Sequence, residues 1–492
     1  MKNLIKMSKI ILMAIALLFS SCKDYLDVNL DPNNPADATM NLILPAGQAS
    51  IAVVIGGEYH NLGGFWSQYY TQSPDASQWE DIDMYNVSSD KFDNQWNEMY
   101  AGGINDLQTV RDKATASGDN TYYLIATLCQ AYSYQVLADL FDKVPYSEAL
   151  QGVTKSNVNP NYDNGADIYA GLLSTIDEAV ARYQKTPKGE DPGKADLFYN
   201  GDMDQWLRFA NSLKLKLYMR MAYTSKADPS AVKALLAANK FITSDAAMTQ
   251  FGTSINKRNP FYEVHSDRLG GVNEMASNTM IKLLTDNSDP RIDAYYSQGS
   301  TGKWVAKEQG DFTNRDIPSA QLAKPKTSPT APVYLLTVTE LNFLVAEARV
   351  RYEGGASAQE AYENGIDASF AMHALGSGAS MYSSGGVYEY KSTGNVENDV
   401  KQIALQKWIS LCNTQNLEAF FELNRTHIPA YSTNAKGTPG GIGELTISYN
   451  SVLATGETPR RLLFPDVERA RNNKFPGQPA KGLATKIWWD NK

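Results

Sequence analysis

Apolar residues recur at helical spacing along most of this chain. Between residues 120 and 141 they come every three or four positions and also fill much of the opposite side, so we predict a helix buried nearly all round. Residues 166–183 and 203–223 carry a one-sided apolar stripe instead, which predicts helices with one face in the core. In the second of these, cations that include Arg208 and Arg220 are expected to keep the other side in water.

Further helices are predicted from caps and weaker periodicity. Thr337 and Glu340 have the spacing of a capping box, directly ahead of an apolar run that begins at Leu341. Residues 400–412 give another apolar stripe. Weaker patterns predict helices at residues 40–55, 92–116, 229–240, 273–285 and 357–373.

Long polar segments rich in Gly, Pro, Asn and Ser separate these helices. They cover residues 56–90, 142–165, 241–272, 286–332, 374–396 and 428–482. Loops of this length inside a compact chain are usually functional. We therefore interpret the helices as a scaffold and the loops as the working surface.

Several predicted helices follow one another across short polar turns, which is typical of tetratricopeptide-type hairpins. The sequence contains no clean 34-residue repeat of that kind. We predict a mainly α fold, a tetratricopeptide-like helix-pair scaffold with long irregular loops and little β structure. No change in composition marks a second domain, so residues 37–492 are predicted to form one domain.

The beginning of the chain has the features of a lipoprotein signal peptide. Three lysines precede the apolar run at residues 10–19, and small residues then stand directly before Cys22. We predict a signal peptide at residues 1–21, lipid attachment at Cys22 and a tether at residues 22–36. The alternative is an ordinary secretory signal cleaved near Ser20. No other stretch approaches 18 apolar residues, so we expect the lipid alone to hold the protein to a membrane.

The composition is that of an ordinary globular protein with an acidic charge balance. The chain has 54 acidic and 45 basic residues in 492, a formal charge of −9, with 43% hydrophobic residues. Removal of the three lysines in the first 21 residues would leave 42 basic residues against 54 acidic ones, or −12. This balance, without a basic run, argues against nucleic acid or an anionic membrane surface as a partner and favours a neutral ligand.

Catalytic and metal-binding motifs are missing from the sequence. There is no phosphate-binding loop, no zinc-binding His motif and no nucleophile elbow. Cys129 and Cys412 lie in apolar helical stretches and are interpreted as buried thiols, and the four histidines have no metal-like spacing. A pair of carboxylates brought together by the fold stays open, but acids such as Asp83 are interpreted as solvated loop residues. We expect no catalytic residue, cofactor or metal.

Aromatic density is the strongest local signal. Ten aromatic residues fall between Tyr59 and Tyr100, and some of them, such as Phe92 and Trp96, have the spacing of a helix stripe in the core. Others stand in polar loops beside amides and acids, where flat rings can cover the apolar face of a sugar. The candidate ligand-binding residues are Trp79, Tyr85, Asn86, Tyr296 and Trp304. The alternative is that each ring only holds its loop to the scaffold.

At this point the chain resembles the SusD/RagB family of outer-membrane lipoproteins of the Bacteroidetes. The resemblance extends over nearly the whole mature length. It rests on CKDYLD at 22–27, FDKVPYSEA at 141–149, WLRFANSLK at 206–214, ELNFLVAEA at 340–348, QKWI at 406–409, LEAF at 417–420, RRL at 460–462 and KIWW at 486–489.

This resemblance implies a fold of tetratricopeptide-like helix pairs packed against irregular loops. It also implies a place on the cell surface and a partner, a SusC-like TonB-dependent transporter over which the lipoprotein sits as a lid. Members of the family mostly bind glycans, so we expect an oligosaccharide ligand that is passed to the transporter without being cleaved. Oligopeptide binding, as in RagB-like members, is the second interpretation, and a glycoside hydrolase the third.

Overall fold

The computed structural model describes residues 38–185 and 187–492. The predicted signal peptide, the lipid attachment at Cys22 and the tether at residues 22–36 lie outside the described residues, and they stay predictions. One continuous hydrophobic cluster includes residues from Leu44 near the beginning of the described chain to Trp489 near its end.

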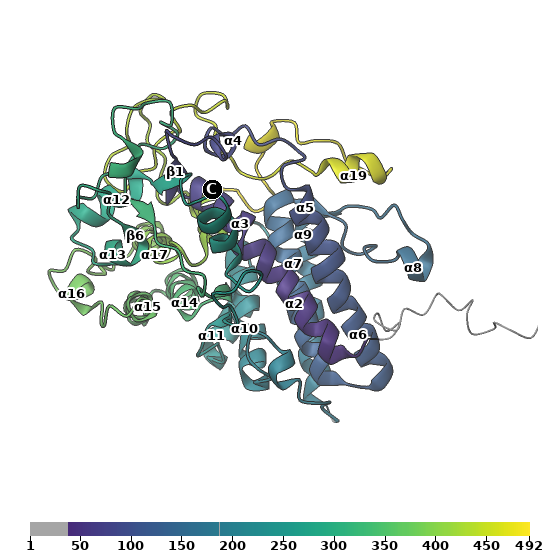
Figure 1. Cartoon of the computed structure of the whole chain (residues 1–492). Coiled ribbons are helices and arrows are strands. Elements are labelled where there is room, and N and C mark those ends of the chain that lie inside the picture. The colour runs from purple at the N-terminus through teal and green to yellow at the C-terminus, as the bar shows by residue number, and fades with distance from the viewer. Residues whose placement is uncertain (1–37, 186) are drawn as a thin grey trace, which may run out of the picture.

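The first half of the chain builds a layer of long helices. The helices α2 (Met40–Gly56), α6 (Asn105–Ser117), α7 (Asn120–Phe141) and α9 (Gly165–Gln184) run side by side at one end of the molecule (Figure 1). Helix α7 has the predicted bounds and is buried on almost every side. Asp119 caps its first turn, where its carboxylate accepts the Tyr122 backbone N–H at 2.9 Å.

The second half adds further helix pairs. Helices α14 (Val338–Tyr352) and α15 (Ala358–Met372) form a pair, and α10 (Met203–Arg220) and α17 (Val396–Ser410) pack against α14. The Thr337 hydroxyl accepts the Glu340 N–H at 3.0 Å, so the predicted cap at the beginning of α14 is confirmed. The mainly α fold with a helix-pair scaffold is thus confirmed.

Strands in the described residues are short and pair in twos, all antiparallel. This agrees with the predicted scarcity of β structure. The pairs are β1 (Tyr70–Gln72) with β5 (Glu274–Ala276), β2 (Lys143–Val144) with β3 (Asp163–Asn164), β4 (Ala246–Met248) with β8 (Val333–Leu336), and β6 (Tyr296–Ser297) with β7 (Lys324–Pro325).

Shorter helical elements complete the described chain. They are α4 (Glu80–Asp83), α5 (Asp93–Asn97), η1 (Glu98–Ile104), α8 (Gly152–Lys155), η2 (Gly193–Ala195), α11 (Pro229–Ala238), η3 (Tyr262–Arg268), α12 (Asn278–Asp286), α13 (Arg291–Tyr295), η4 (Ser319–Gln321), α16 (Ala379–Tyr382), α19 (Asp466–Arg471) and η5 (Gly482–Ala484).

Two predicted segments were wrong in part. The region 56–90 was predicted to be a polar loop, but it contains the buried helix α3 (Glu58–Trp66). The helix predicted at 273–285 is present from Asn278 as α12, but the residues before it form strand β5. Helix α3 packs so closely on α18 (Asn416–Thr426) that a Cβ atom on Gly63 would lie 2.3 Å from the backbone of that helix. The glycines that make this contact possible are the residues that weaken a helical pattern in the sequence.

The segment Met40–Trp66, which comprises α2 and α3, is long and apolar enough by composition to cross a membrane. The expectation that no other stretch approaches such a length was therefore too strict. Half of its apolar window is buried inside the protein, and α2 packs against α6 and η1. The apolar residues of this segment thus form part of the hydrophobic core.

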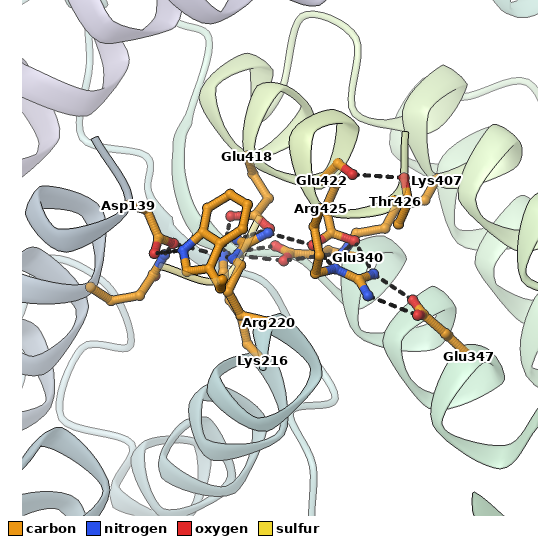
Figure 2. A network of polar contacts seen from close by, with 12 residues as sticks. Asp139, Lys216, Arg220, Glu340, Glu347, Lys407, Glu418, Glu422, Arg425 and Thr426 are labelled. Atoms are coloured by element: carbon orange, nitrogen blue, oxygen red, sulfur yellow. Dashed lines mark hydrogen bonds and ion pairs between the residues drawn. The ribbon is translucent and has the colours of Figure 1, made fainter. Parts of the chain in front are cut away.

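A buried network of charged side chains joins the helices α7, α10, α14, α17 and α18 (Figure 2). Arg220 of α10 lies at its centre, where it bonds to Asp139 of α7 at 3.2 Å and to Glu418 of α18 at 2.6 Å, and also pairs with Glu422. The prediction that Arg220 faces water was wrong, because this side chain is only 1% exposed. Its three carboxylate partners come from α7 and α18, which are far apart in the sequence.

The other side of the network is equally well paired. Arg425 binds Glu347 of α14 through two hydrogen bonds of 2.6 and 2.8 Å, and also bonds to Glu422. Burial alone would raise the pKa of Glu347, but the guanidinium groups of Arg425 and Arg351 lower it to about 2. The network therefore fixes α18, whose beginning forms part of the site described next.

Candidate functional site

A cavity of about 380 Å³ lies where the helical scaffold meets the loops. Its floor consists of buried side chains from α2, α7, α18 and β1. The rim consists of half-buried or exposed residues of the segment 326–334 and of the end of α15. A volume of this size is within the range of small-ligand pockets, about 300–1,000 Å³.

One wall of this cavity is a cluster of neutral polar groups. The Asn416 side-chain amide donates to Nε2 of His60 at 3.0 Å and to the Tyr70 hydroxyl at 3.1 Å, and that hydroxyl donates to Asn413 Oδ1. Burial, and then the nearby His265, lower the pKa of His60 to about 3. His60 is consequently a neutral imidazole at ordinary pH, and this wall carries no charge.

The floor of the cavity reaches the buried charge network. Glu418 lines the cavity, and its two oxygens bond to Arg220 at 2.6 Å and to Lys216 at 2.8 Å. Burial raises the pKa of Glu418, but these two cations outweigh it and lower the pKa below the ordinary value. Tyr132 stands beside Glu418, and its hydroxyl makes no hydrogen bond to any residue that the structure describes. The deepest polar groups are thus an ionised acceptor and a free phenol.

A second cavity of about 300 Å³ adjoins the first. Phe261, Lys326 and Thr327 line both cavities. The ring of Phe261 stacks on that of His265 at 4.4 Å between centroids, and Nδ1 of His265 lies 2.7 Å from Glu274. The π-helical turn η3 carries His265 and directs it towards this second cavity.

Two of the predicted ligand-binding residues are buried and lie next to residues that line the second cavity. Trp79 is 4% exposed and packs against His265 at 5.2 Å between ring centroids. Tyr296 is completely buried and donates its hydroxyl to the Tyr69 carbonyl at 3.1 Å, while the next residue, Ser297, lines the cavity. Their ring faces are covered by protein, as expected of rings that hold their loops to the scaffold.

The other three predicted residues lie apart from both cavities. Tyr85 is 1% exposed and packs near Tyr431. The side chain of Asn86 is exposed, and Trp304 is half-buried against the core. The structure therefore does not gather the five candidates into one surface, and a ligand contact at any of them stays a prediction.

The residues that line the cavities were not singled out as ligand contacts from the sequence. They come from α3, α7, α18, η3 and loop segments that only tertiary packing brings together. Three of the four histidines, which have no metal-like spacing in the sequence, line the cavities: His60, His265 and His373. No local spacing could have found them.

The described residues also bear on metal binding and on reactive side chains. Within residues 38–185 and 187–492, no group of three or more His, Cys, Asp or Glu side chains is suited to hold a metal ion. Cys129 and Cys412 are buried and unpaired, and burial raises the pKa of each thiol. Asp83 is not the solvated loop acid that was predicted. It is buried and accepts hydrogen bonds from Thr71 and the Gln72 N–H, and burial raises its pKa to about 6.

Comparison with known proteins places the fold. A SusD/RagB family protein from Bacteroides thetaiotaomicron matches with a TM-score of 0.73 and 21% identity over 92% of this chain and 99% of its own. A SusD homologue from Bacteroides uniformis gives 0.72 and 20% over 93% and 100%. A chitin-binding SusD homologue from Flavobacterium johnsoniae gives 0.73 and 20% over 91% and 98%.

No curated protein matches the sequence. The family model SusD-like_2, described as "Starch-binding associating with outer membrane", matches residues 32–443. This confirms the resemblance inferred from the sequence motifs. Because the match extends over most of its length, the chain belongs to the SusD-like family.

Proposed function

We propose that this protein is a cell-surface lipoprotein that binds an oligosaccharide and delivers it to a SusC-like TonB-dependent transporter of the outer membrane, without cleaving it. The family description, starch-binding and associated with the outer membrane, supports the ligand class and the location. Structural neighbours described as chitin-binding support the same ligand class. Lipid attachment at Cys22 rests on the lipoprotein signal pattern of residues 1–22. The transporter partner rests on the family resemblance.

The observation that carries the proposal is the pair of adjoining cavities on the two sides of Phe261. Sugars present hydroxyl groups around an apolar ring, and they suit pockets that combine apolar walls with a few fixed polar groups. The larger cavity offers apolar walls such as Ile55 and Val136, together with the amide and imidazole cluster around Asn416. A neutral imidazole at His60 suits an uncharged ligand.

Within this proposal the residues predicted from the sequence take two roles. The exposed amide of Asn86 and the half-buried ring of Trp304 remain candidates for contact with outlying sugar residues of a longer ligand. Trp79, Tyr85 and Tyr296 act through packing. For example, Trp79 backs His265, so that its indole fixes a residue of the second cavity.

The test begins with ligand class. The purified protein is screened against a glycan array and an oligopeptide library, and the best ligand is titrated by calorimetry. Glycan binding without a change in chain length over a day, measured by mass spectrometry, is expected. Binding of peptides alone would favour the oligopeptide interpretation, and cleavage of the glycan would revive the hydrolase.

A substitution at the shared rim then locates the site. Thr327 is exposed and lines both cavities, so Thr327→Trp would block their mouths while leaving the core intact. We expect at least about tenfold weaker glycan binding, with an unchanged melting temperature. Thr330→Trp is the matched control, because Thr330 is exposed on the same loop but lines neither cavity. Equal affinity in the two variants would contradict this location.

A further inference from the structure

The larger cavity is closed at the bottom. Its floor is made of side chains that are at most 7% exposed: Ile55, Tyr70, Tyr132, Val136, Glu418 and Phe421. Its rim is made of exposed residues such as Lys326 and Thr327 and half-buried ones such as Pro332. A chain molecule can therefore enter this cavity from the rim, but it cannot pass through.

The adjoining smaller cavity also contains buried residues, namely His265 and Glu274 besides Phe261, but most of its lining reaches the surface. Besides the shared rim residues, Ser297 is exposed and Ser266, Gly271 and Lys324 are only partly buried. Internal residues of a linear ligand could lie along this more open surface. Phe261 stands between the two cavities, so a ligand in both would turn past its ring.

The floor of the larger cavity carries hydrogen-bonding capacity that the protein leaves unused. The Tyr132 hydroxyl has no hydrogen-bond partner among the described residues. The carboxylate oxygens of Glu418, held by Arg220 and Lys216, can each accept a further hydrogen bond. These groups suit the hydroxyls of one sugar ring at the bottom of the cavity.

The volume limits how much of a ligand can enter. About 380 Å³ is near the lower end of ligand-pocket sizes, which is room for about one or two sugar rings rather than a long segment. A ring that fills the floor therefore leaves little room for the chain to continue beyond it.

We propose that the larger cavity binds the terminal sugar residue, so that the protein selects oligosaccharides by a free chain end instead of gripping internal segments of a polymer. This inference rests on the proposed oligosaccharide function. It assigns the Tyr132 hydroxyl and the Glu418 carboxylate to recognition of that end, and the smaller cavity to the residues that follow it.

The inference is tested with the best glycan from the array in four forms. The forms are the unmodified oligosaccharide, the same compound reduced to its alditol, the same compound capped at the non-reducing end, and a cyclic or long polymeric form with the same linkage. We expect one of the two end modifications to weaken binding about tenfold, as the loss of hydrogen bonds at a closed floor would. The form that binds weakly identifies which end enters.

The polymer provides an independent readout. If ends are selected, calorimetry should give one bound protein per chain whatever the chain length, and the cyclic form should bind weakly. Equal binding of all the end-modified forms, or many proteins per polymer chain, would overturn end selection while the oligosaccharide function would stand. Failure of every glycan to bind would overturn both.

Substitutions at Tyr132 and Glu418 test whether the cavity floor recognises the chain end. Tyr132→Phe removes one hydroxyl without opening space, and the expected result is that the unmodified sugar binds as weakly as the sensitive end-modified form. Tyr123→Phe is the control, since Tyr123 is on the same helix but outside the cavity. If Tyr132→Phe still binds the unmodified sugar more tightly than the end-modified form, Tyr132 does not take part in the recognition. If Glu418→Gln keeps the same difference in affinity as well, recognition of the chain end at the floor is overturned.

Discussion

Two polar clusters meet at helix α18, and they differ in how completely their groups are paired. In the charge network, Arg220 alone contacts three carboxylates, and it lines neither of the two cavities. In the cavity wall, neutral groups such as His60 and Asn416 bond to one another, and the nearby Tyr132 hydroxyl stays free beside an open volume. Buried polar groups thus have two roles here. Those that are paired with one another stabilise the fold, whereas unpaired groups that line a cavity favour ligand binding.

The largest expected effect comes from a substitution that breaks the charge network. Arg220→Ala would leave Asp139, Glu418 and Glu422 as a group of buried carboxylates without their central cation. Removing one partner of a buried ion pair costs about 3–5 kcal/mol, so we expect a loss of at least this size in urea unfolding.

Arg208→Ala is the matched control on the same helix. Arg208 pairs with Asp204 one turn away, and both side chains are partly or largely exposed. Exposed pairs contribute about 0.2–1 kcal/mol, so a small loss is expected. Equal losses in the two variants would contradict the contrast between a buried and a solvated cation.

The next prediction compares stability and ligand affinity in two aromatic substitutions, one at a buried ring and one at a half-buried ring. Trp79→Ala removes a ring that is 4% exposed, and truncation of a buried Trp costs about 3–5 kcal/mol. Trp304 is only half-buried, so Trp304→Ala should change stability less. If its ring contacts the ligand, the affinity should fall about tenfold. Thermal unfolding and calorimetry on both variants check this, and unchanged affinity in Trp304→Ala would remove that ring from the site.

The last effect concerns pH. The pKa of His60 is lowered to about 3 by burial and by His265, so this imidazole stays neutral between pH 5 and 8, and its protonation should not change ligand affinity in that range. In the unfolded chain the pKa is near 6.5, so His60 contributes stability above that pH which is lost progressively as the pH falls towards 3.

In His60→Gln, the free energy of unfolding should fall less steeply as the pH is lowered. Urea unfolding of both proteins at pH 8, 6.5 and 5 measures it. A slope that is identical in wild type and variant would show that His60 is equally protonated in the folded and unfolded states.

The sequence was sufficient where the pattern is local. Helix α7 has the predicted bounds because its apolar residues occupy every side and Asp119 begins it with a cap. The beginning of α14 follows in the same way from Thr337 and Glu340. The order of motifs likewise identified the family, which the match over residues 32–443 confirms.

Tertiary structure decided the rest. Arg208 and Arg220 occupy similar helical patterns, yet one is near solvent and the other is buried, because only the fold brings Asp139 and Glu418 to the second. The loop ring of Trp79 is buried for the same reason, since it packs on His265, which is distant in the sequence. Local periodicity determines which residues form a helix, but the partners that bury a charge, cover a ring or enclose a cavity come from segments hundreds of residues apart.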